Sequence, residues 1–392
     1  MPYGYPKYRN LTSRTPPQAA SAIVEKPEWD PDHVYAYRPA NNYRGSRIID
    51  RGDAEEESGK VIQAAIDYVA GKGGGVVWII EGEYDLNSSI IALSDKAYVN
   101  IVGNNAVIKN GEISISGTHH NNNKRNRIVG LRFDNASIVI SNGFGNVIEY
   151  CVFENAEYGI KLHNTATWTE FTHIRRCDFI KCTIGILFET PDGGAGQSYA
   201  NTSIDSCSFS LSVSNSYGIK TNSQTQLSDS KITGCRFWHN VDNTIGIYIY
   251  GHAGGCLIQS KFESFVGTPT NVVGIDIAGA SWATLPVIVG GGFSASGFTA
   301  KINNLTTARS RGLKVVGVQN LNVDNLGTAT IMSGATSVTV DHGLDAKPRI
   351  VIPIPRSNIG SIWVSNVTDT QFTINCSSAP TEDVQVDWYA EV

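Results

Sequence analysis

A Cys-x-Phe unit recurs along the middle of this chain, and the recurrence constrains the fold more than any other feature. The unit stands in IEYCVFENAEYGI (148–160) and IRRCDFIKCTIGI (174–186), and it returns as CSF and CRF. Aligned on phenylalanine, successive units lie 20 to 31 residues apart. The aligned residues are Phe133, Phe153, Phe179, Phe209, Phe237, Phe262 and Phe293. A Gly-Ile pair follows five of them, and the distance from Phe to Gly grows from 6 to 12 residues. The strands therefore repeat while one connecting loop lengthens.

The period and the composition together predict a solenoid. Only 17% of the residues are charged and 39 are glycine, which favours a β-rich chain over a helical one. A repeat of this length accommodates two or three short strands, each stacked on its counterpart in the next coil. It lacks the regular pattern of a leucine-rich repeat and is too short for a four-stranded propeller blade. We therefore predict an all-β fold, a right-handed parallel β-helix. The Cys and Phe of each unit should face inward, because residues two apart on a strand share a face.

The recurring cysteines raise the question of metal, disulfide or redox chemistry. No two of the seven form Cys-x-x-Cys, and no histidine pair supplies zinc-finger spacing. The start of the chain, MPYGYPKYRN, has no apolar segment typical of a secretory signal, so we expect synthesis in a cytoplasm and free thiols. Cys151, Cys177, Cys207 and Cys235 fall one per coil in a single inward column, which predicts an unbridged ladder of buried thiols. We expect no metal site and no cofactor.

Both ends of the repeat region differ from its middle. The stretch EEESGKVIQAAIDYVA (55–70) has apolar residues at helical spacing, with Ser58 as a plausible N-cap and Gly71 as a stop. A helix there would cover the open end of the first coil. Residues 1–50 show no periodicity and are predicted to form an extended N-terminal arm. Short alternating strands from about residue 327 predict a small antiparallel β-sandwich. The predicted domains are therefore the arm (1–50), the β-helix with its cap helix (51–326) and the C-terminal domain (327–392), which would serve binding or trimerisation.

Residues 50–110 resemble the opening of pectate-lyase-superfamily β-helix proteins. The segment RGDAEEESGKVIQAAIDYVAGKGGGVVWIIEGEYDLNSSI (51–90) holds, in order, an acidic loop, an IQAAID helix, a GGGVV turn and a GEYDL strand. Phage tailspikes and tail-fibre depolymerases commonly begin this way. The departure is Glu55-Glu56-Glu57-Ser58 where the family usually has Asp-Asp-Thr, and we interpret it as favourable electrostatics at a helix start. The end of the chain, from GATSVTVDHGL (334–344) onward, is similar to small C-terminal β domains of viral tail proteins.

The strands that begin at each Gly-Ile pair predict a sugar-binding face. Alternation places two stacked columns outward. The first column is Lys161, Leu187, Lys220, Tyr248 and Asp276, and the second is His163, Glu189, Asn222, Tyr250 and Ala278. Aromatic rings suit sugar faces, while amides and charged groups suit hydroxyls, although an ordinary solvated sheet face remains the alternative. Trp168, in the loop HNTATWTEFTH (163–173), is a candidate stacking residue beside this face. The predicted substrate-binding residues are Lys161, His163, Trp168, Lys220, Asn222, Tyr248 and Tyr250.

Two carboxylate pairs are candidates for hydrolysis. Glu154 and Asp178 point outward on adjacent coils at a backbone separation of about 8 Å, which suits an inverting mechanism. The second pair is Glu189 with Asp192, which lies in the glycine-rich loop TPDGGAGQSYAN (190–201). Elimination would instead need a base and a cation that neutralises a uronate carboxylate, and residues of the right types are Lys161, His163, Lys220, Tyr248 and Tyr250. Both reactions stay open, with hydrolysis preferred.

The resemblance implies a viral tailspike or receptor-binding protein that binds and cleaves a cell-surface or extracellular polysaccharide. Such proteins are usually homotrimers. The expected place is the virion tail, with synthesis in the host cytoplasm, action outside the cell and contacts to other tail proteins through residues 1–50. The net charge is −5, and the sequence shows no basic patch of the kind that binds nucleic acid. No apolar run approaches the ~20 residues of a membrane span. The alternative is a non-enzymatic glycan-binding or structural tail-fibre protein.

Overall fold

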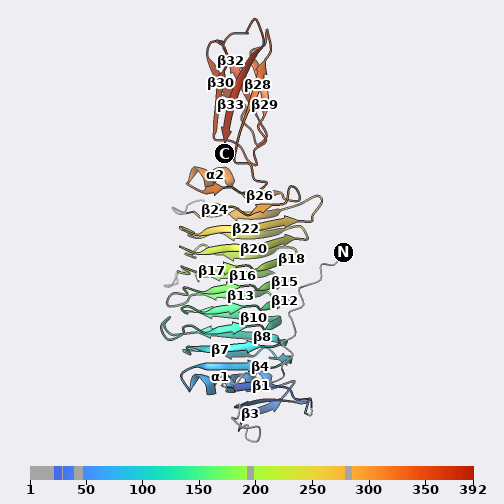
Figure 1. Ribbon diagram of the computed structural model, residues 1–392, viewed down its shortest axis with the longest axis vertical. Coiled ribbons are helices and arrows are strands. Elements are labelled where there is room, and N and C mark those ends of the chain that lie inside the picture. The colour runs from blue at the N-terminus through green and yellow to red at the C-terminus, as the bar shows by residue number, and fades with distance from the viewer. Residues whose placement is uncertain (1–21, 29, 39–46, 192–197, 279–284) are drawn as a thin grey trace.

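Stacked β-coils form a column along most of the chain, with a small β domain at its C-terminal end (Figure 1). The computed structural model describes residues 22–28, 30–38, 47–191, 198–278 and 285–392. Asp192 lies outside these ranges. The helix α1 (Ser58–Ala70) lies beside the first coils, where the sequence predicted a cap. The predicted all-β solenoid with a cap helix and a C-terminal antiparallel domain is confirmed.

Each coil contributes strands to three parallel ladders, named A, B and C in chain order. Ladder A contains β4 (Gly75–Ile79), β7 (Val99–Gly103), β9 (Arg127–Val129), β11 (Val147–Glu149), β14 (His173–Arg175), β17 (Ser203–Asp205), the first parts of β20 (Lys231–His239) and β22 (Leu257–Ser264), β24 (Val287–Val289) and β27 (Lys314–Val316). Ladder B contains β5 (Gly82–Asp85), the first parts of β8 (Ala106–Ser116) and β10 (Arg132–Ser141), β12 (Val152–Glu154), β15 (Asp178–Ile180), β18 (Ser208–Leu211), the second parts of β20 and β22, and β25 (Gly292–Phe293). Ladder C contains β6 (Ile90–Ala92), the second parts of β8 and β10, β13 (Tyr158–His163), β16 (Ile184–Glu189), β19 (Ser216–Thr221), β21 (Thr244–Ile249), β23 (Val272–Ile277) and β26 (Ala300–Asn303).

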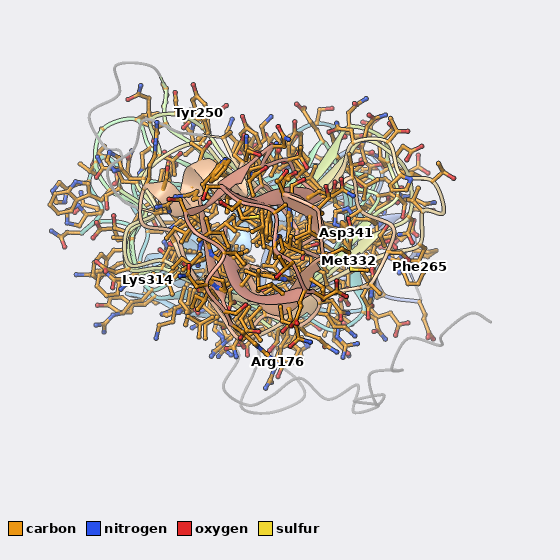
Figure 2. All side chains as sticks on the ribbon, turned by 90° about the horizontal axis from the view of Figure 1, so that it is seen from above. Arg176, Tyr250, Phe265, Lys314, Met332 and Asp341 are labelled. Atoms are coloured by element: carbon orange, nitrogen blue, oxygen red, sulfur yellow. The ribbon has the colours of Figure 1, made fainter. Side chains whose placement is uncertain are left out.

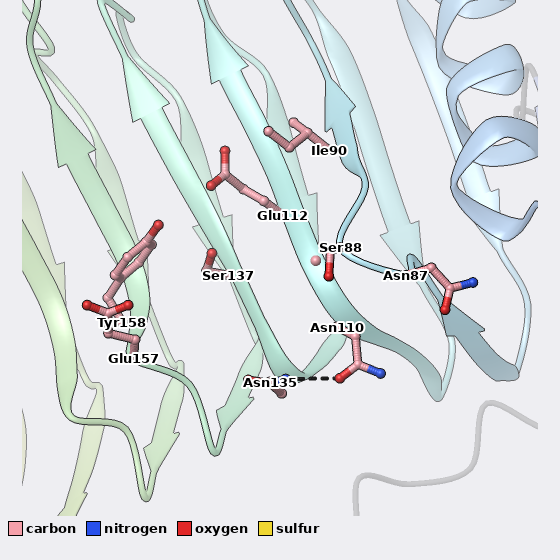
Figure 3. Close-up of a pocket in the computed structure, with 10 residues that line it drawn as sticks. Asn87, Ser88, Ile90, Asn110, Glu112, Asn135, Ser137, Glu157 and Tyr158 are labelled. Atoms are coloured by element: carbon pink, nitrogen blue, oxygen red, sulfur yellow. Dashed lines mark hydrogen bonds between the residues drawn. The ribbon is translucent and has the colours of Figure 1, made fainter. Parts of the chain in front are cut away.

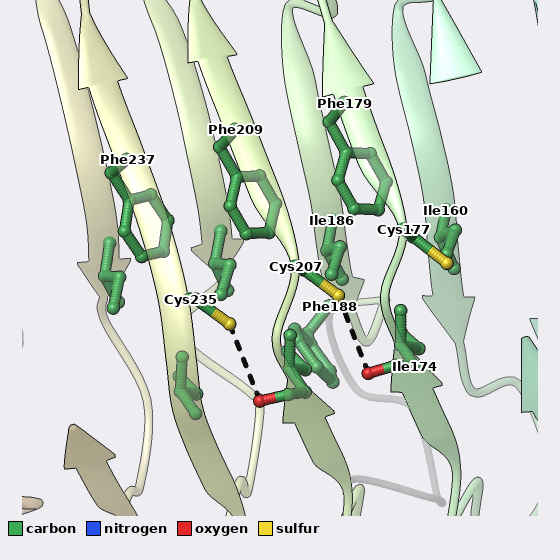
Figure 4. Close-up of a cluster of buried hydrophobic side chains, with 14 of the residues drawn as sticks. Ile160, Ile174, Cys177, Phe179, Ile186, Phe188, Cys207, Phe209, Cys235 and Phe237 are labelled. Carbon is green, nitrogen blue, oxygen red and sulfur yellow. Dashed lines mark hydrogen bonds between the residues drawn. The ribbon is translucent and has the colours of Figure 1, made fainter. Parts of the chain in front are cut away.

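The phenylalanines of ladder B form one continuous stack inside the column. Neighbouring ring centroids lie 4.6 to 5.1 Å apart and within 16° of parallel, from Phe133 to Phe293. The rings are buried, as the sequence predicted (Figure 4). This spacing follows directly from the separation of neighbouring strands, because each coil places its ring at the same position.

The Gly-Ile column of ladder C lies against this phenylalanine stack. A Cβ added to Gly218 would lie 2.6 Å from ring carbons of Phe237 and 2.6 Å from the carbonyl oxygen of Gly246. A Cβ added to Gly185 would likewise lie 2.7 Å from the ring of Phe209. The two columns therefore recur together because each ring occupies the space that a side chain on the glycine of the preceding coil would need.

The cysteines of ladder B fill the slot next to the phenylalanines. All seven cysteines of the chain are buried and free, which confirms the predicted unbridged ladder. The thiols point at backbone carbonyls of the preceding coil: Cys207 Sγ lies 3.7 Å from the oxygen of Ile174, and Cys235 Sγ lies 3.7 Å from that of Ile204 (Figure 4). They are therefore packing residues with weak hydrogen bonds.

The start of α1 differs from the prediction. Glu57, not Ser58, is the N-cap residue, so the assignment of Ser58 was wrong. Ser58 is buried, and its hydroxyl donates 2.8 Å back to the carbonyl oxygen of Ala54. The Glu57 carboxylate instead accepts the backbone N–H of Asp53 at 3.0 Å and pairs with Lys60 at 2.8 Å. Gly71 follows the last helical residue, as predicted.

Strands also lie within the stretch predicted to be an extended arm. These are β1 (Ala22–Glu25), β2 (His33–Arg38) and β3 (Arg47–Asp53). β1 pairs in parallel with β4 and antiparallel with β2, which in turn pairs with β3. Buried Val24 and Val34 belong to the core beside α1. The strands are too short, and too closely bounded by Pro27, Pro31 and Pro39, to give a visible periodicity.

The C-terminal domain consists of two antiparallel three-stranded sheets. Their strands are β28 (Asp324–Ile331), β33 (Val384–Glu391) and β30 (Ile350–Pro355) in one sheet, and β29 (Ser337–Asp341), β32 (Gln371–Cys376) and β31 (Ile362–Ser365) in the other. Buried Phe372 and Trp388, one from each sheet, pack edge to face at 5.4 Å. The helix α2 (Leu305–Ser310) precedes the domain, at the end of the column (Figure 1).

Candidate functional site

The outward side of ladder C, here called the C face, carries the predicted polar and aromatic columns. Lys161 stands opposite Leu187, Leu187 opposite Lys220, and Lys220 opposite Tyr248. Asp276 follows on the next coil. Viewed along the column, Tyr250 projects on a different side from Arg176 and Phe265 (Figure 2).

Lys161, His163 and Glu189 form one contact group on this face, the Glu189 cluster. Glu189 of one coil accepts an ion pair from Lys161 of the preceding coil, and its Oε2 atom lies 3.3 Å from His163 Nδ1. Burial lowers the pKa of His163, and the Lys161 charge acts in the same direction, while Glu189 opposes both. The imidazole is therefore mainly neutral near pH 7, so the cluster carries one cation matched by one carboxylate.

Tyrosines continue the face toward the C-terminal coils. The Nζ atom of Lys220 lies 4.4 Å from the ring centroid of Tyr217. Tyr217 meets Tyr248 edge to face at 5.6 Å, and Tyr248 lies nearly parallel to Tyr250 at 6.4 Å. Tyr158 repeats the motif two coils earlier, with Lys161 Nζ at 5.5 Å from its ring. Cation–aromatic contacts therefore recur along the C face.

Tyr158 and Tyr217 were missed by reasoning from the sequence. Strict alternation from the inward Ile160 would turn Tyr158 inward, but the intervening Gly159 points at the Phe179 ring, and Tyr158 turns outward. The same holds for Gly218 between Tyr217 and Ile219. A signal was present, because both tyrosines stand in a Tyr-Gly-Ile triplet.

A pocket of about 810 Å³ opens at the N-terminal end of the C face, at the corner between ladders B and C (Figure 3). We call it the corner pocket. It is lined by Asn87, Ser88, Ile90, Asn110, Gly111, Glu112, Asn135, Ser137, Glu157 and Tyr158. Its floor is ordered by hydrogen bonds from Asn110 to Asp85 at 2.8 Å and from Asn135 to Asn110 at 3.0 Å. The backbones of Asn110 and Asn135 are left-handed, which asparagine tolerates well, and they turn the chain from ladder B into ladder C.

Glu112 is the half-buried carboxyl group of the corner pocket. It stands opposite Ile90 on one side and Ser137 on the other. Burial raises its pKa, and the Lys161 charge and the Ser114 hydroxyl only partly offset this effect. The alignment of the repeats on phenylalanine began at Phe133 and therefore did not include Glu112. The preceding coil has Ile108 at the position of the phenylalanine.

Several predicted residues do not join the C face. Glu154 and Asp178 lie on ladder B, before the left-handed corners at Asn155 and Lys181 that lead into ladder C. Glu154 is held in an ion pair with Arg132, and burial raises the pKa of Asp178. The chain direction changes at these corners, so the two carboxylates do not share one surface with Lys161.

Asn222 is a turn residue. Its Nδ2 atom donates to the carbonyl oxygen of Thr190 at 2.6 Å, and its Oδ1 atom accepts from the Thr225 hydroxyl at 2.8 Å. Asp192, the remaining catalytic candidate, falls outside the described residues. Asn222 is therefore better explained as a structural residue than as a sugar ligand.

Trp168 lies at the corner that follows ladder C, in a group of aromatic side chains. Its ring stacks on His120 at 5.1 Å, and half of its surface is exposed. His120 also lies 6.1 Å from Phe144, which meets Phe171 at 4.8 Å. Three successive coils thus contribute rings to one partly exposed patch, with Trp168 as its most exposed ring.

Within the described ranges, no cluster of three or more His, Cys, Asp or Glu side chains is placed to hold a metal ion. Neither of the two helices described has the length and apolar character that a membrane span requires.

No known family profile matches this chain, and no curated protein matches it either. Among solved structures, the chain is similar to the surface adhesin PfbA of Streptococcus pneumoniae, at 13% identity over 68% of this chain and 89% of that one, with a TM-score of 0.38. It is similar to a mutant tailspike protein of E. coli bacteriophage HK620 in complex with a pentasaccharide, at 12% identity over 85% and 89%, with a TM-score of 0.35. It is also similar to the tailspike protein of Acinetobacter phage vB_ApiP_P1, at 10% identity over 91% and 92%, with a TM-score of 0.37. Similarity at this level assigns no activity to the chain.

Proposed function

We propose that this protein binds a cell-surface or extracellular polysaccharide along the C face and cleaves it by hydrolysis. The observation that carries the proposal is the set of outward tyrosines along ladder C, with lysines against Tyr158 and Tyr217 and with Tyr248 on the coil after Tyr217. Aromatic rings offer apolar faces to sugar rings, and the flanking charged and amide groups suit hydroxyls. Two coils separate Tyr158 from Tyr217, a distance of about 10 Å, so an extended glycan would lie along the column and meet both.

Hydrolysis is favoured over elimination by the state of the cations. Elimination at a uronate needs a positive group that neutralises the substrate carboxylate. Lys161 is already paired with Glu189, and Lys220 lies against the ring of Tyr217. The C face therefore suits a neutral or weakly charged glycan better than a polyuronate.

Binding without cleavage is the second candidate function. It is favoured by the ion pairs that hold Glu154 and Glu189, two of the carboxylates predicted to be catalytic. In that case the protein would be a glycan-binding or structural fibre.

A virion-tail location and a homotrimeric state are part of the proposal. Both are supported by the resemblance of residues 50–110 to phage tailspikes. An exposed apolar row on the outer side of the C-terminal sheet also favours self-association: Leu326 lies opposite Tyr389, and Tyr389 opposite Ile352. Contacts to other tail proteins are assigned to residues 1–50. Sedimentation of wild type and Ile352→Glu tests the trimer: a monomeric wild type would contradict it.

The test of function uses a panel of bacterial and plant polysaccharides. Release of reducing ends without new ultraviolet absorbance indicates hydrolysis, release with absorbance indicates elimination, and binding alone indicates the second candidate. Tyr217→Ala and Tyr248→Ala should each weaken binding by about 1 kcal/mol, or about fivefold. Trp363→Ala removes an exposed ring from the C-terminal domain and should leave binding unchanged. Absence of binding across host polysaccharides would refute the proposal.

A further inference from the structure

The corner pocket differs in charge from the rest of the C face. Two carboxyl groups, those of Glu112 and Glu157, line it, and no lysine, arginine or histidine is among the lining residues. The remaining lining groups are mainly amides, hydroxyls and the phenol of Tyr158. The pocket is open and mainly polar, which suits a hydrophilic ligand such as one unit of a glycan.

Three glutamates of the column have cationic partners, whereas Asp276, also buried, is held by the amides of Asn303 and Asn304. Glu154 pairs with Arg132, Glu189 with Lys161, and Glu149 with Arg127 and Arg175. Within the described residues, Glu112 makes no such ion pair. Ionisation of this half-buried carboxyl group is costly, because burial removes water from the charge, and the Ser114 hydroxyl and the Lys161 charge only partly offset that loss. A cation bound in the pocket would therefore stabilise the ionised form of Glu112.

The nearest cation is Lys161, and it does not fill this role. Its ammonium group is engaged by Glu189 of the following coil and lies 5.5 Å from the Tyr158 ring centroid. Its charge reaches Glu112 but only partly offsets the effect of burial. The contact also shows that the Tyr158 ring accepts a neighbouring positive charge.

We propose that the corner pocket binds one sugar unit that carries a protonated amino group. This inference rests on the proposed glycan-binding function and names a substrate class for it. The ammonium group donates to Glu112, with Glu157 as a second, more exposed acceptor. The Ser88 and Ser137 hydroxyls hydrogen-bond the sugar hydroxyls, and Tyr158 forms the aromatic wall. An N-acetylated unit lacks the charge and leaves Glu112 without a partner.

The experiment compares two probes that share a backbone: the hexamer of glucosamine and the hexamer of N-acetylglucosamine. Calorimetry with the full chain measures both dissociation constants. The glucosamine hexamer should bind about tenfold more tightly, since a hydrogen bond to a charged partner contributes more than one to a neutral partner. Glu112→Gln, which keeps the shape of the side chain, should remove this preference. Glu83→Gln, a change at an exposed glutamate of the neighbouring ladder B, should keep it.

Equal affinity of wild type for the two hexamers would overturn the inference, as would a preference that survives in Glu112→Gln. Either result leaves the proposed function intact if Tyr217→Ala still weakens binding to a polysaccharide of the panel. Conversely, loss of all polysaccharide binding refutes the proposed function, whatever the hexamers do. The circular dichroism spectrum of Glu112→Gln should match that of wild type, which separates loss of the charge from loss of the fold.

Discussion

Replacement of Gly218 by alanine tests the contact between the Gly-Ile column and the phenylalanine stack. The new methyl group would lie 2.6 Å from ring carbons of Phe237 on one side and 2.6 Å from the Gly246 carbonyl oxygen on the other. Neither neighbour can retreat easily, because the ring lies in a stack with both of its neighbours and the carbonyl belongs to a ladder strand. Overpacking of this kind costs about 1–3 kcal/mol. In a position without crowding, Gly to Ala would instead stabilise by about 0.4–1 kcal/mol.

Gly267→Ala is the matched control. Its added Cβ meets nothing within 4 Å, and its backbone is not in the left-handed region. The assay is native-state hydrogen exchange of β19 and β21, since a solenoid opens locally and a single global free energy is poorly defined for it. We expect Gly218→Ala to lower the free energy of opening of these strands, and Gly267→Ala not to lower it.

A second variant isolates the ring as the cause. Phe237→Leu leaves more room beside position 218, so the double variant should lose less stability than the sum of the two single changes. Additive losses, or a Gly218→Ala protein as stable as Gly267→Ala, would refute the claim that the ring excludes a side chain at this column.

Three further predictions concern buried groups and the C face. Burial lowers the pKa of His239 to about 3, so its contribution to stability is present above about pH 6.5 and is lost as the pH falls toward 3; His239→Leu should flatten urea-unfolding curves measured across this window. Glu149 is buried, which by itself would raise its pKa, but the hydrogen bond and charge of Arg127, with the charge of Arg175, hold the pKa below its usual value. Its stabilisation is therefore present above about pH 4.3 and lost below, and Glu149→Gln should remove that part of the acid sensitivity, measured by the same unfolding curves. The ladder thiols, Cys207 among them, should resist a thiol reagent in the native protein and react fully in denaturant; rapid native labelling would contradict their burial.

The repeating part of the fold was predictable because each coil meets the same packing problem. Phe179 and Gly185 recur at matching places in their coils since the stack admits one ring and no extra Cβ beside it. Such a constraint repeats in the sequence and can be recognised in a single chain, without related sequences. The strands β1 and β2 do not repeat anything, and their six residues or fewer gave no period to detect.

The candidate site was only partly predictable for the same reason. Lys161 and Tyr248 followed from alternation, since the strand is regular from Ile160 and Ile247 onward. Tyr158 did not, because the glycine beside it breaks the alternation. Hydrogen bonds between turns, such as those of Asn222, depend on residues that only the fold brings together. No pattern in a single sequence distinguishes such a structural amide from one that binds a ligand.

The ladders also determine how the column carries force. Their hydrogen bonds join one coil to the next and so lie along the long axis (Figure 1). Tension applied between the N-terminal end and the C-terminal domain therefore acts on the hydrogen bonds of every pair of neighbouring coils in series. The gap that opens under the smallest force therefore sets the tensile strength of the whole column, however well the other coils are packed.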